Sequence, residues 1–172
     1  QQNSALHYAV ENRCYEVAKI CIEKGADVNT ARNNYSTPLH LAATAGDVQI
    51  VELLLDHNAR IDALDINQST PLHKAAAYNH AGVVEFLLER GAKIDKHDKD
   101  NFSPLLIAAC NGHAETIKTL LDKGANLYTM DKNDKTAVYW CAEEDSSEPL
   151  KVLLEHPRSK DLLDMSDRYD NT

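Results

Sequence analysis

The stretch Ser36–Ala59 reads STPLHLAATAGDVQIVELLLDHNA. Thr37 has a side-chain oxygen that can accept a hydrogen bond from a free amide at a helix start. Pro38 suits the first helical position, because no amide hydrogen bond is lost there. Apolar residues then recur at helical spacing, first among alanines and later from Ile50 to Leu55. The stretch therefore predicts two short helices joined by a polar turn.

The same pattern returns with a period of 33 residues. Its two strongest copies begin at Thr37 and Thr70, and weaker copies begin at Ser4, Ser103 and Thr136. The motif residues are Thr37, Pro38, Leu39, His40, Thr70, Pro71, Leu72 and His73, with His7 in the first copy. Self-similarity at a fixed period indicates a repeat architecture. The copies divide the chain into five units, at residues 4–36, 37–69, 70–102, 103–135 and 136–171.

Three further columns of the aligned units support this register. One column holds small residues, namely Ala9, Ala42, Ala75, Ala108 and Cys141. A second column is apolar, with Cys21, Leu54, Leu87, Leu120 and Leu153. The second helix of each of the first four units is expected to end at a residue that tolerates the left-handed conformation. These residues are Gly25, Asn58, Gly91 and Gly124.

This unit resembles the ankyrin repeat, whose signature is T-P-L-H-x-A. The segment NGHAETIKTLLDKGANL, at residues 111–127, is close to the consensus of that family, and the resemblance covers essentially the whole chain. It implies an all-α solenoid of about five helix pairs with hairpin fingers between them. Because a terminal unit needs a polar cap and none is visible, we expect a fragment of a longer array, cut at both ends.

The resemblance also implies that the motif histidine, His40 in the second unit, hydrogen-bonds to a neighbouring unit. A regular column of histidines could instead bind a metal ion. Its members stand one per unit, however, so neighbours lie about 10 Å apart on stacked helices. That separation is too large for shared ligation at Zn–N distances of about 2 Å. We therefore expect a structural column and no metal or other cofactor.

The last two units depart from the pattern. The fourth has Leu106 in place of the histidine, and the fifth replaces the whole motif at residues 136–139. The fifth also has three extra residues, which we place within 155–167, where Pro157 stands in the column of the left-handed residues. Drift and bending of the solenoid explain these departures better than a special function does. The finger turns lack the family glycine and are expected to be less rigid than average; they hold Tyr35 or Asn34, Gln68, Asn101, Asp134 and Asp170.

Composition and motifs restrict the function. A net charge of -9, from 18 basic and 27 acidic residues, repels phosphate backbones, so we expect no nucleic-acid partner. No apolar run approaches the roughly 20 residues that span a bilayer. No Walker A, G-x-S-x-G or H-E-x-x-H sequence occurs. Cys141 and His113 could act as nucleophile and base, but Cys141 falls in the small-residue column and should be buried. We therefore expect no catalysis.

The four cysteines form no C-x-x-C pair and have no zinc-site spacing; they are Cys14, Cys21, Cys110 and Cys141. We interpret them as reduced, inert thiols. Oxidant sensing is the alternative for Cys14 and Cys110, which lie in less buried columns. Arg13 is adjacent to Cys14, and a positive neighbour favours the reactive thiolate.

The resemblance implies binding of other proteins through a concave face built from the fingertips and the first helices. The variable residues expected there are Arg32, Tyr35, Thr44, Gln68, Tyr78, Asn101, Phe102, Asn111 and Asp134. Aromatic side chains among polar neighbours suit a contact surface. The alternative is a solvated face with scattered aromatic residues.

A narrower resemblance rests on the late units. Residues 102–127 read FSPLLIAACNGHAETIKTLLDKGANL, a degenerate unit follows, and residues 153–172 read LLEHPRSKDLLDMSDRYDNT. This order of departures resembles the long N-terminal array of ankyrin-type transient receptor potential channels of invertebrates. It implies one subunit of a tetrameric, sensory, non-selective cation channel, with this segment at the cytoplasmic side of the plasma membrane. The alternatives are a soluble cytoplasmic scaffold and an ankyrin domain fused to an enzyme.

Overall fold

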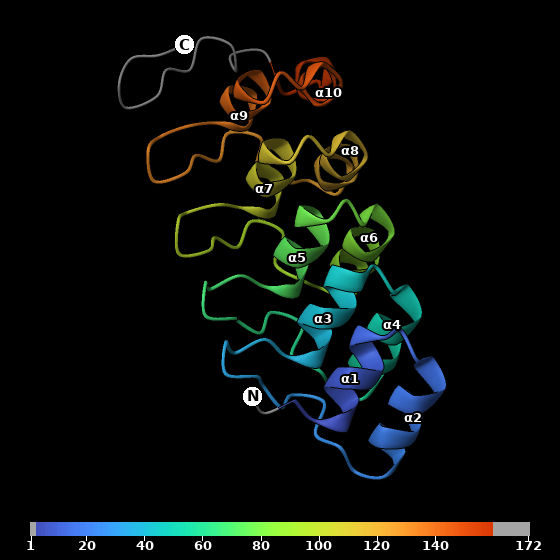
Figure 1. Ribbon diagram of the computed structural model, residues 1–172. Helices are drawn as coiled ribbons and strands as arrows, with labels where there is room; N and C mark the ends of the chain where they lie inside the picture. The colour runs from blue at the N-terminus through green and yellow to red at the C-terminus, as the bar shows by residue number, and fades with distance from the viewer. Residues whose placement is uncertain (1–2, 160–172) are drawn as a thin grey trace.

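The computed structural model describes residues 3–159. These residues form ten α-helices and no strand, with one isolated bridge between Met130 and Thr136. In chain order the helices are α1 (Ala5–Glu11), α2 (Tyr15–Glu23), α3 (Pro38–Ala45), α4 (Val48–Asp56), α5 (Pro71–Ala77), α6 (Ala81–Glu89), α7 (Pro104–Cys110), α8 (Ala114–Asp122), α9 (Ala137–Glu143) and α10 (Ser147–Glu155). Each unit contributes one consecutive helix pair, which confirms the all-α solenoid (Figure 1).

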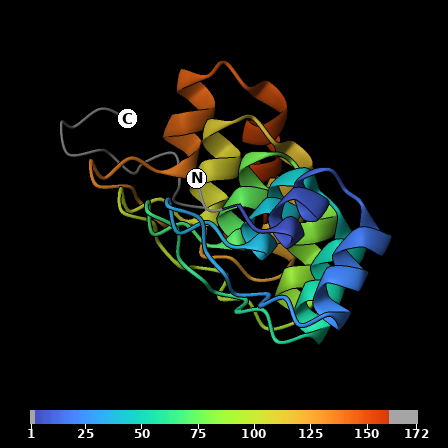
Figure 2. The same ribbon diagram turned by 60° about the horizontal axis from the view of Figure 1, so that its bottom comes forward.

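The helices stack in two rows. The odd-numbered helices form one row and the even-numbered helices form the other, and neighbours within each row are in contact. Four long loops join the helix pairs, at residues 24–37, 57–70, 90–103 and 123–136. We call these loops the fingers. They project from the odd-numbered row, away from the even-numbered row (Figure 2).

The motif residues start the odd-numbered helices as the sequence predicts. In α5 the Thr70 side chain accepts a hydrogen bond from the His73 amide, and the His73 ring accepts one from the Thr70 amide. Pro71 occupies the first turn. The helix starts at Ser4 and Thr37 use the histidine ring in the same way. These contacts satisfy amides that a helix start leaves unpaired.

The predicted left-handed residues are also confirmed. The backbone angle φ is 90°, 66°, 91° and 94° at Gly25, Asn58, Gly91 and Gly124. In the finger turns φ is 60°, 59°, 65° and 62° at Tyr35, Gln68, Asn101 and Asp134. Helix α10 ends differently, because His156 precedes Pro157 and is extended at φ −68° and ψ 134°. The segment 155–167, where the extra residues were placed, lies partly outside the described residues.

Each finger is held by hydrogen bonds of its own. One carboxylate oxygen of Asp65 accepts the amides of Asn67 and Ser69, and Asp98 and Asp131 cap their fingers in the same way. Main-chain hydrogen bonds also link consecutive fingers, from Ile66 to Asn34, from Lys99 to Asn67 and from Lys132 to Asp100. The fingers are therefore part of the stacked structure, and their expected lower rigidity stays a prediction.

One continuous apolar core runs between the two rows. The small-residue column is buried in all five units, and the second column is fully buried at Leu54, Leu87, Leu120 and Leu153. Cys21, in the first unit, is only half-buried. Small residues in the first column let the odd-numbered helices approach closely, and the leucines fill the space behind them. No helix among residues 3–159 is both long and apolar enough to cross a membrane.

Replacing Leu87 by alanine tests this core. The side chain is fully buried at the centre of the array, so we expect Leu87→Ala to lower the free energy of unfolding by about 2–5 kcal/mol. The matched control is Ile66→Ala, since Ile66 is 60% exposed and should change stability by no more than about 0.5 kcal/mol. Urea unfolding followed by circular dichroism measures both values. Equal effects of the two substitutions would contradict the assigned core.

Candidate functional site

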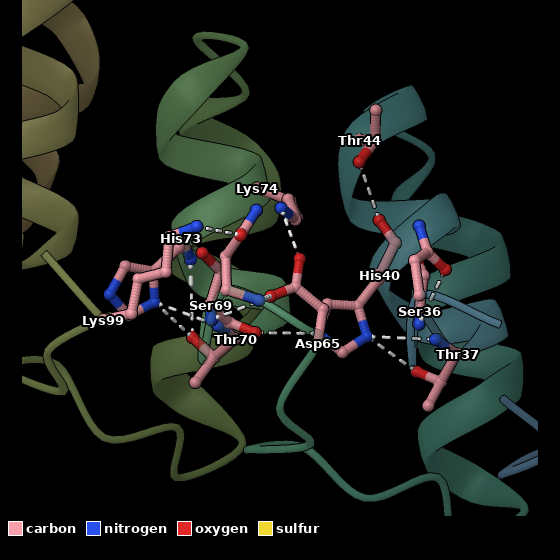
Figure 3. A network of polar contacts seen from close by, with 12 residues as sticks. Ser36, Thr37, His40, Thr44, Asp65, Ser69, Thr70, His73, Lys74 and Lys99 are labelled. Atoms are coloured by element: carbon pink, nitrogen blue, oxygen red, sulfur yellow. Dashed lines mark hydrogen bonds and ion pairs between the residues drawn. The ribbon is translucent and has the colours of Figure 1, made fainter. Parts of the chain in front are cut away.

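The motif histidines connect one helix pair to the next. The Nδ1 atom of His40 accepts a hydrogen bond from the Thr37 amide at 3.2 Å, and its Nε2 lies 3.0 Å from the Ser69 carbonyl oxygen. The ring of His73 makes the equivalent contacts, at 3.1 Å to the Thr70 amide and 3.1 Å to the Phe102 carbonyl. Figure 3 shows the two rings with Thr37, Ser69 and Thr70. Because Nδ1 accepts an amide hydrogen, each ring is neutral with its proton on Nε2, which donates to the carbonyl.

A second set of histidines connects the same pairs in the opposite direction. His80 lies at the start of α6, and its Nε2 is 2.9 Å from the Thr44 carbonyl of the preceding pair. The Nε2 of His113, at the start of α8, is 3.1 Å from the Ala77 carbonyl. His113 therefore holds the repeat interface. The Cys141 thiol, its suggested partner, lies 3.9 Å from the Ala109 carbonyl oxygen.

The polar connections are concentrated at the two central interfaces. The interface of the second and third units and that of the third and fourth units each have one histidine contact in each direction. At the first interface burial lowers the pKa of His7 and contacts with the Ser36 and Thr30 main chain oppose that shift, but its buried Nε2 makes no well-formed hydrogen bond. At the last interface Leu106 and Ser146 occupy the two histidine columns. The expected tie between units is made by His40 and His73 through Ser69 and Phe102, the last residues of their own units, directly before the next helix start.

Salt bridges on the outer row follow the same distribution. Arg90, after α6, contacts Glu52 and Asp56 of α4 at 3.6 and 2.9 Å. Lys123, after α8, contacts Glu85 and Glu89 of α6 at 3.0 and 2.8 Å. His57 and His156 occupy this column in the second and fifth units. The salt bridges of Arg90 and Lys123 therefore join the same units as the histidine contacts do.

Burial sets the charge of the motif histidines. It lowers the pKa of His73 from 6.5 to about 4, and it lowers the pKa of His40 in the same direction. Asp98 favours a proton on His73 and Asp65 favours one on His40, while Lys74 opposes both. The Lys74 ammonium lies 2.7 Å from the Asp65 carboxylate. Burial alone would raise the pKa of Asp65, but the Lys74 ammonium and the finger amides hold it below its usual value.

The lowered pKa of His73 predicts a pH dependence of stability. As pH falls from 6.5 towards about 4, the unfolded chain takes up the proton and the folded chain does not. The contribution of His73 is therefore complete above the unfolded pKa and is lost on acidification through this window. The expected loss is about 3 kcal/mol, and urea unfolding between pH 7.5 and 4 measures it.

One variant isolates this effect. His73→Leu should remove the part of the slope that His73 contributes, because Leu106 shows that the column accepts a fully buried leucine. The part that His40 contributes should remain, because burial lowers the pKa of its ring too. A wild-type stability that stays constant across this pH range would contradict the buried, neutral ring.

The predicted contact residues belong to the fingers or lie in or directly after the odd-numbered helices, and we call the surface of these elements the finger face. The exposed members of the set are Tyr35, Gln68, Tyr78, Asn101 and Asn111. Arg32, Thr44, Phe102 and Asp134 are half-buried. Their assignment to partner binding stays a prediction.

Three of the half-buried residues have contacts within the chain. Arg32 makes a bidentate ion pair with Glu11, at 2.8 and 3.3 Å, and the Thr44 hydroxyl donates to the His40 carbonyl. The Phe102 ring packs against the Trp140 ring with centroids 5.5 Å apart. These residues shape the finger face more than they offer free side chains to a partner.

The structure adds two residues that the sequence analysis missed. Tyr8 is 53% exposed and Ile66 is 60% exposed. Tyr8 belongs to the same column as Lys74 and Trp140, which both contact fingers, so it lies on the finger face. Ile66 could have been found from its place in a finger, two residues before Gln68.

Lys135, Tyr139 and Trp140 form an aromatic cluster on the finger face at the fifth unit. The Lys135 ammonium lies 3.9 Å from the centre of the Tyr139 ring and 5.0 Å from that of Trp140. It also contacts the Tyr139 hydroxyl at 2.7 Å and the Glu143 carboxylate at 3.4 Å. Lys135, the last residue of the fourth unit, is thus held by groups of the fifth unit, and the cluster packs the last interface without histidines.

The cysteines have different surroundings. Cys141 is buried, as predicted, and burial raises the pKa of its thiol to about 12. Burial, followed by Glu144 and Glu143, raises the pKa of the half-buried Cys110 thiol. Cys14 is exposed, and the Nε atom of its neighbour Arg13 lies 3.8 Å from the Asp47 carboxylate. Among residues 3–159 no group of three or more histidine, cysteine and acidic side chains could hold a metal ion.

Alkylation of the native protein checks these surroundings. Iodoacetamide should modify Cys14 readily and leave Cys141 unmodified until the chain unfolds, because only the thiolate reacts. Mass spectrometry of the digested protein gives the modified fraction of each cysteine, with Cys21 as a half-buried reference. Rapid modification of Cys141 under native conditions would contradict its burial.

Comparison with known protein families identifies the repeating unit. A family model described as ankyrin repeats (3 copies) matches residues 6–98 and 91–164. Ankyrin repeats are protein-interaction modules and are typically non-catalytic. Comparison with curated proteins finds no match.

Proposed function

Because the chain belongs to the ankyrin repeat family, we propose that it is a non-catalytic segment that binds a partner protein through the finger face. The observation that carries this proposal is the position of its exposed apolar side chains. Tyr8, Tyr35, Ile66 and Tyr78 are 53–61% exposed; Tyr35 and Ile66 lie in the first two fingers, Tyr8 in α1, and Tyr78 directly after α5. Exposed aromatic groups among polar neighbours are typical of the centre of a protein contact.

The backbone at Tyr35 supports a role in binding. Its φ of 60° is left-handed, a conformation that is unfavourable for a bulky residue and that glycine adopts freely. Such strain is of the order of 1 kcal/mol and persists where the side chain has a use. The Tyr35 side chain is the most exposed large hydrophobic group that the structure describes, so a packing role within the chain does not explain it.

Charge also distinguishes the two ends of the finger face. The first two fingertips, residues 33–35 and 66–68, carry no charged side chain. The next two fingertips carry Lys99, Asp100, Lys132 and Asp134. Lys132 and Asp100 pair with each other at 2.7 Å. The uncharged fingertips favour an apolar or neutral segment of the partner, because burying an unpaired charge there would be unfavourable.

A glycine substitution separates binding from stability. Tyr35→Gly should raise the free energy of unfolding by about 1 kcal/mol by relieving strain, and it should weaken partner binding at least tenfold. Peptides selected from a random linear 12-residue display library against the wild-type chain serve as the binding probe. Their dissociation constants are measured by fluorescence polarisation.

Asn58→Gly is the matched control, because Asn58 is also left-handed and exposed but follows α4 on the outer row. It should change stability in the same direction and leave peptide binding intact. Selected peptides that bind Tyr35→Gly as tightly as the wild type would refute the assignment of the finger face.

A narrower version makes the chain part of the cytoplasmic array of a sensory cation channel, where partner contacts would include other subunits of a tetramer and would couple to gating. The only support for this version is the order in which residues 102–172 depart from the repeat pattern. A soluble cytoplasmic scaffold is supported equally well by the same family membership. The parent transcript beyond Thr172 distinguishes the two versions. Six apolar windows of about 20 residues support the channel, and a stop codon after a polar capping repeat supports the scaffold.

A further inference from the structure

Exposed carboxylates gather at one end of the finger face. Glu143 ends α9, and Glu144 and Asp145 follow it directly. Glu143 contacts the Lys135 ammonium at 3.4 Å, whereas neither Glu144 nor Asp145 makes a salt bridge within residues 3–159. All three acidic residues are exposed. The described part of the chain therefore leaves most of this negative charge unbalanced.

The exposure of Glu144 belongs to its column and not to the fifth unit. Tyr78 and Asn111 hold the same place in the third and fourth units, directly after α5 and α7. Both are exposed although a further helix pair follows each of them. Along this column the exposed side chain thus changes from aromatic, through neutral and polar, to acidic.

Two further observations indicate that a positive group is stabilised at the acidic end. The Lys135 ammonium lies over the Tyr139 ring, at 3.9 Å from its centre, and also contacts Glu143. Burial comes first among the causes that raise the pKa of the Cys110 thiol, and Glu144 and Glu143 follow. The negative potential of the fifth unit therefore reaches the end of α7 in the fourth unit.

The basic side chains of the neighbouring fingertips have contacts elsewhere. The Lys132 ammonium pairs with Asp100 at 2.7 Å. The Lys99 ammonium lies 2.6 Å from the side-chain oxygen of Asn67, on the preceding finger. These contacts hold both cations among the fingertips, so a positive group that balances Glu144 and Asp145 has to come from a binding partner.

We infer that the partner segment is extended, with an aromatic or aliphatic side chain at Tyr78 and a lysine or arginine about six residues away, at Glu144 and Asp145. The inference rests on the proposed function and names the chemistry of its partner. Successive units stack about 10 Å apart, so Tyr78 and Glu144, two units apart in one column, are separated by about 20 Å. An extended chain advances about 3.3 Å per residue, and about six residues cover that distance.

The two halves of this segment have different roles. The apolar half meets the exposed aromatic side chains and the uncharged fingertips, where contact excludes water and contributes most of the affinity. The basic half meets exposed carboxylates, whose attraction raises the association rate and fixes the direction of the segment. Binding should therefore depend on salt, although the fingertips at residues 33–35 and 66–68 carry no charge.

Paired substitutions at the acidic end test the inference with the peptides selected from the 12-residue library. Glu144→Gln with Asp145→Asn should weaken their binding about fivefold at about 50 mM salt and less than about twofold at about 1 M salt, because salt screens exposed charges. Asparagine keeps the left-handed backbone of residue 145, at φ 50°. Fluorescence polarisation gives the dissociation constants.

A matched control has the same change in net charge on the outer row. Glu115 and Asp122 are exposed on α8, and Glu115→Gln with Asp122→Asn should change peptide binding less than about twofold. The peptides supply a second control. Replacing their lysine and arginine by glutamine should cost about fivefold with the wild-type chain and less than about twofold with the acidic-end variant, since the charges then have no counterpart.

The outcomes separate this inference from the proposed function. Peptides that require Tyr35 but bind the acidic-end variant as tightly as the wild type would overturn the inference and leave the proposed function standing. Peptides that tolerate Tyr35→Gly would overturn both. Equal losses in the outer-row control would overturn the inference, because net charge and not position would explain them. Concentration-dependent association of the chain, measured by light scattering and abolished by the acidic-end substitutions, would make a second copy the occupant and also overturn it.

Discussion

The array depends on a neutral imidazole ring that serves two neighbours at once. In His73 one nitrogen accepts the Thr70 amide at the start of α5, and the other donates to the Phe102 carbonyl of the finger that leads to α7. Both partner groups belong to the main chain, so the ring fixes the helix start and the next unit in one arrangement. A protonated ring would lose its acceptor and place a charge in the core. The lowered pKa and the two hydrogen bonds are thus consequences of the same burial.

These contacts are distributed unevenly, and the distribution bears on function. Each of the two central interfaces has a histidine contact from each of its two helix pairs, and the outer-row salt bridges of Arg90 and Lys123 lie at the same interfaces. The first interface has an unpaired His7 nitrogen, and the last is packed by the cluster around Trp140, whose own Nε1 is buried without a partner. Solenoid stability is a sum of unit and interface contributions. The second, third and fourth units, which share these contacts, therefore form the most strongly connected part of the array. The uncharged fingertips at residues 33–35 and 66–68 project from or next to this part, so that a partner meets a surface with little freedom to rearrange.

The sequence predicted the fold closely because its signals are local and repeated. Thr37 with Pro38 predicts a helix start, and Gly91 and Asn58 predict helix ends from backbone preference alone. The partners of the histidines could be stated only through the family resemblance, since the carbonyls of Ser69 and Phe102 lie 29 residues away. The unpaired Nε2 of His7 and the ion pair of Arg32 with Glu11 depend on small differences in how two units pack. Single-sequence patterns do not carry that information. Tyr8 was missed for another reason, because its exposure follows from the stacking and not from residue type, whereas the place of Ile66 in a finger could have identified it.

The central claim is that His40 and His73 are neutral rings that donate from Nε2 to the main chain directly before the next helix pair. Long-range proton–nitrogen NMR of the ¹⁵N-labelled protein at pH 7 observes the ring nitrogens directly. The account predicts the Nε2–H tautomer for both rings, with ring protons that exchange slowly with solvent. Observation of the Nδ1–H tautomer, of a protonated ring or of rapid exchange at either residue would contradict it.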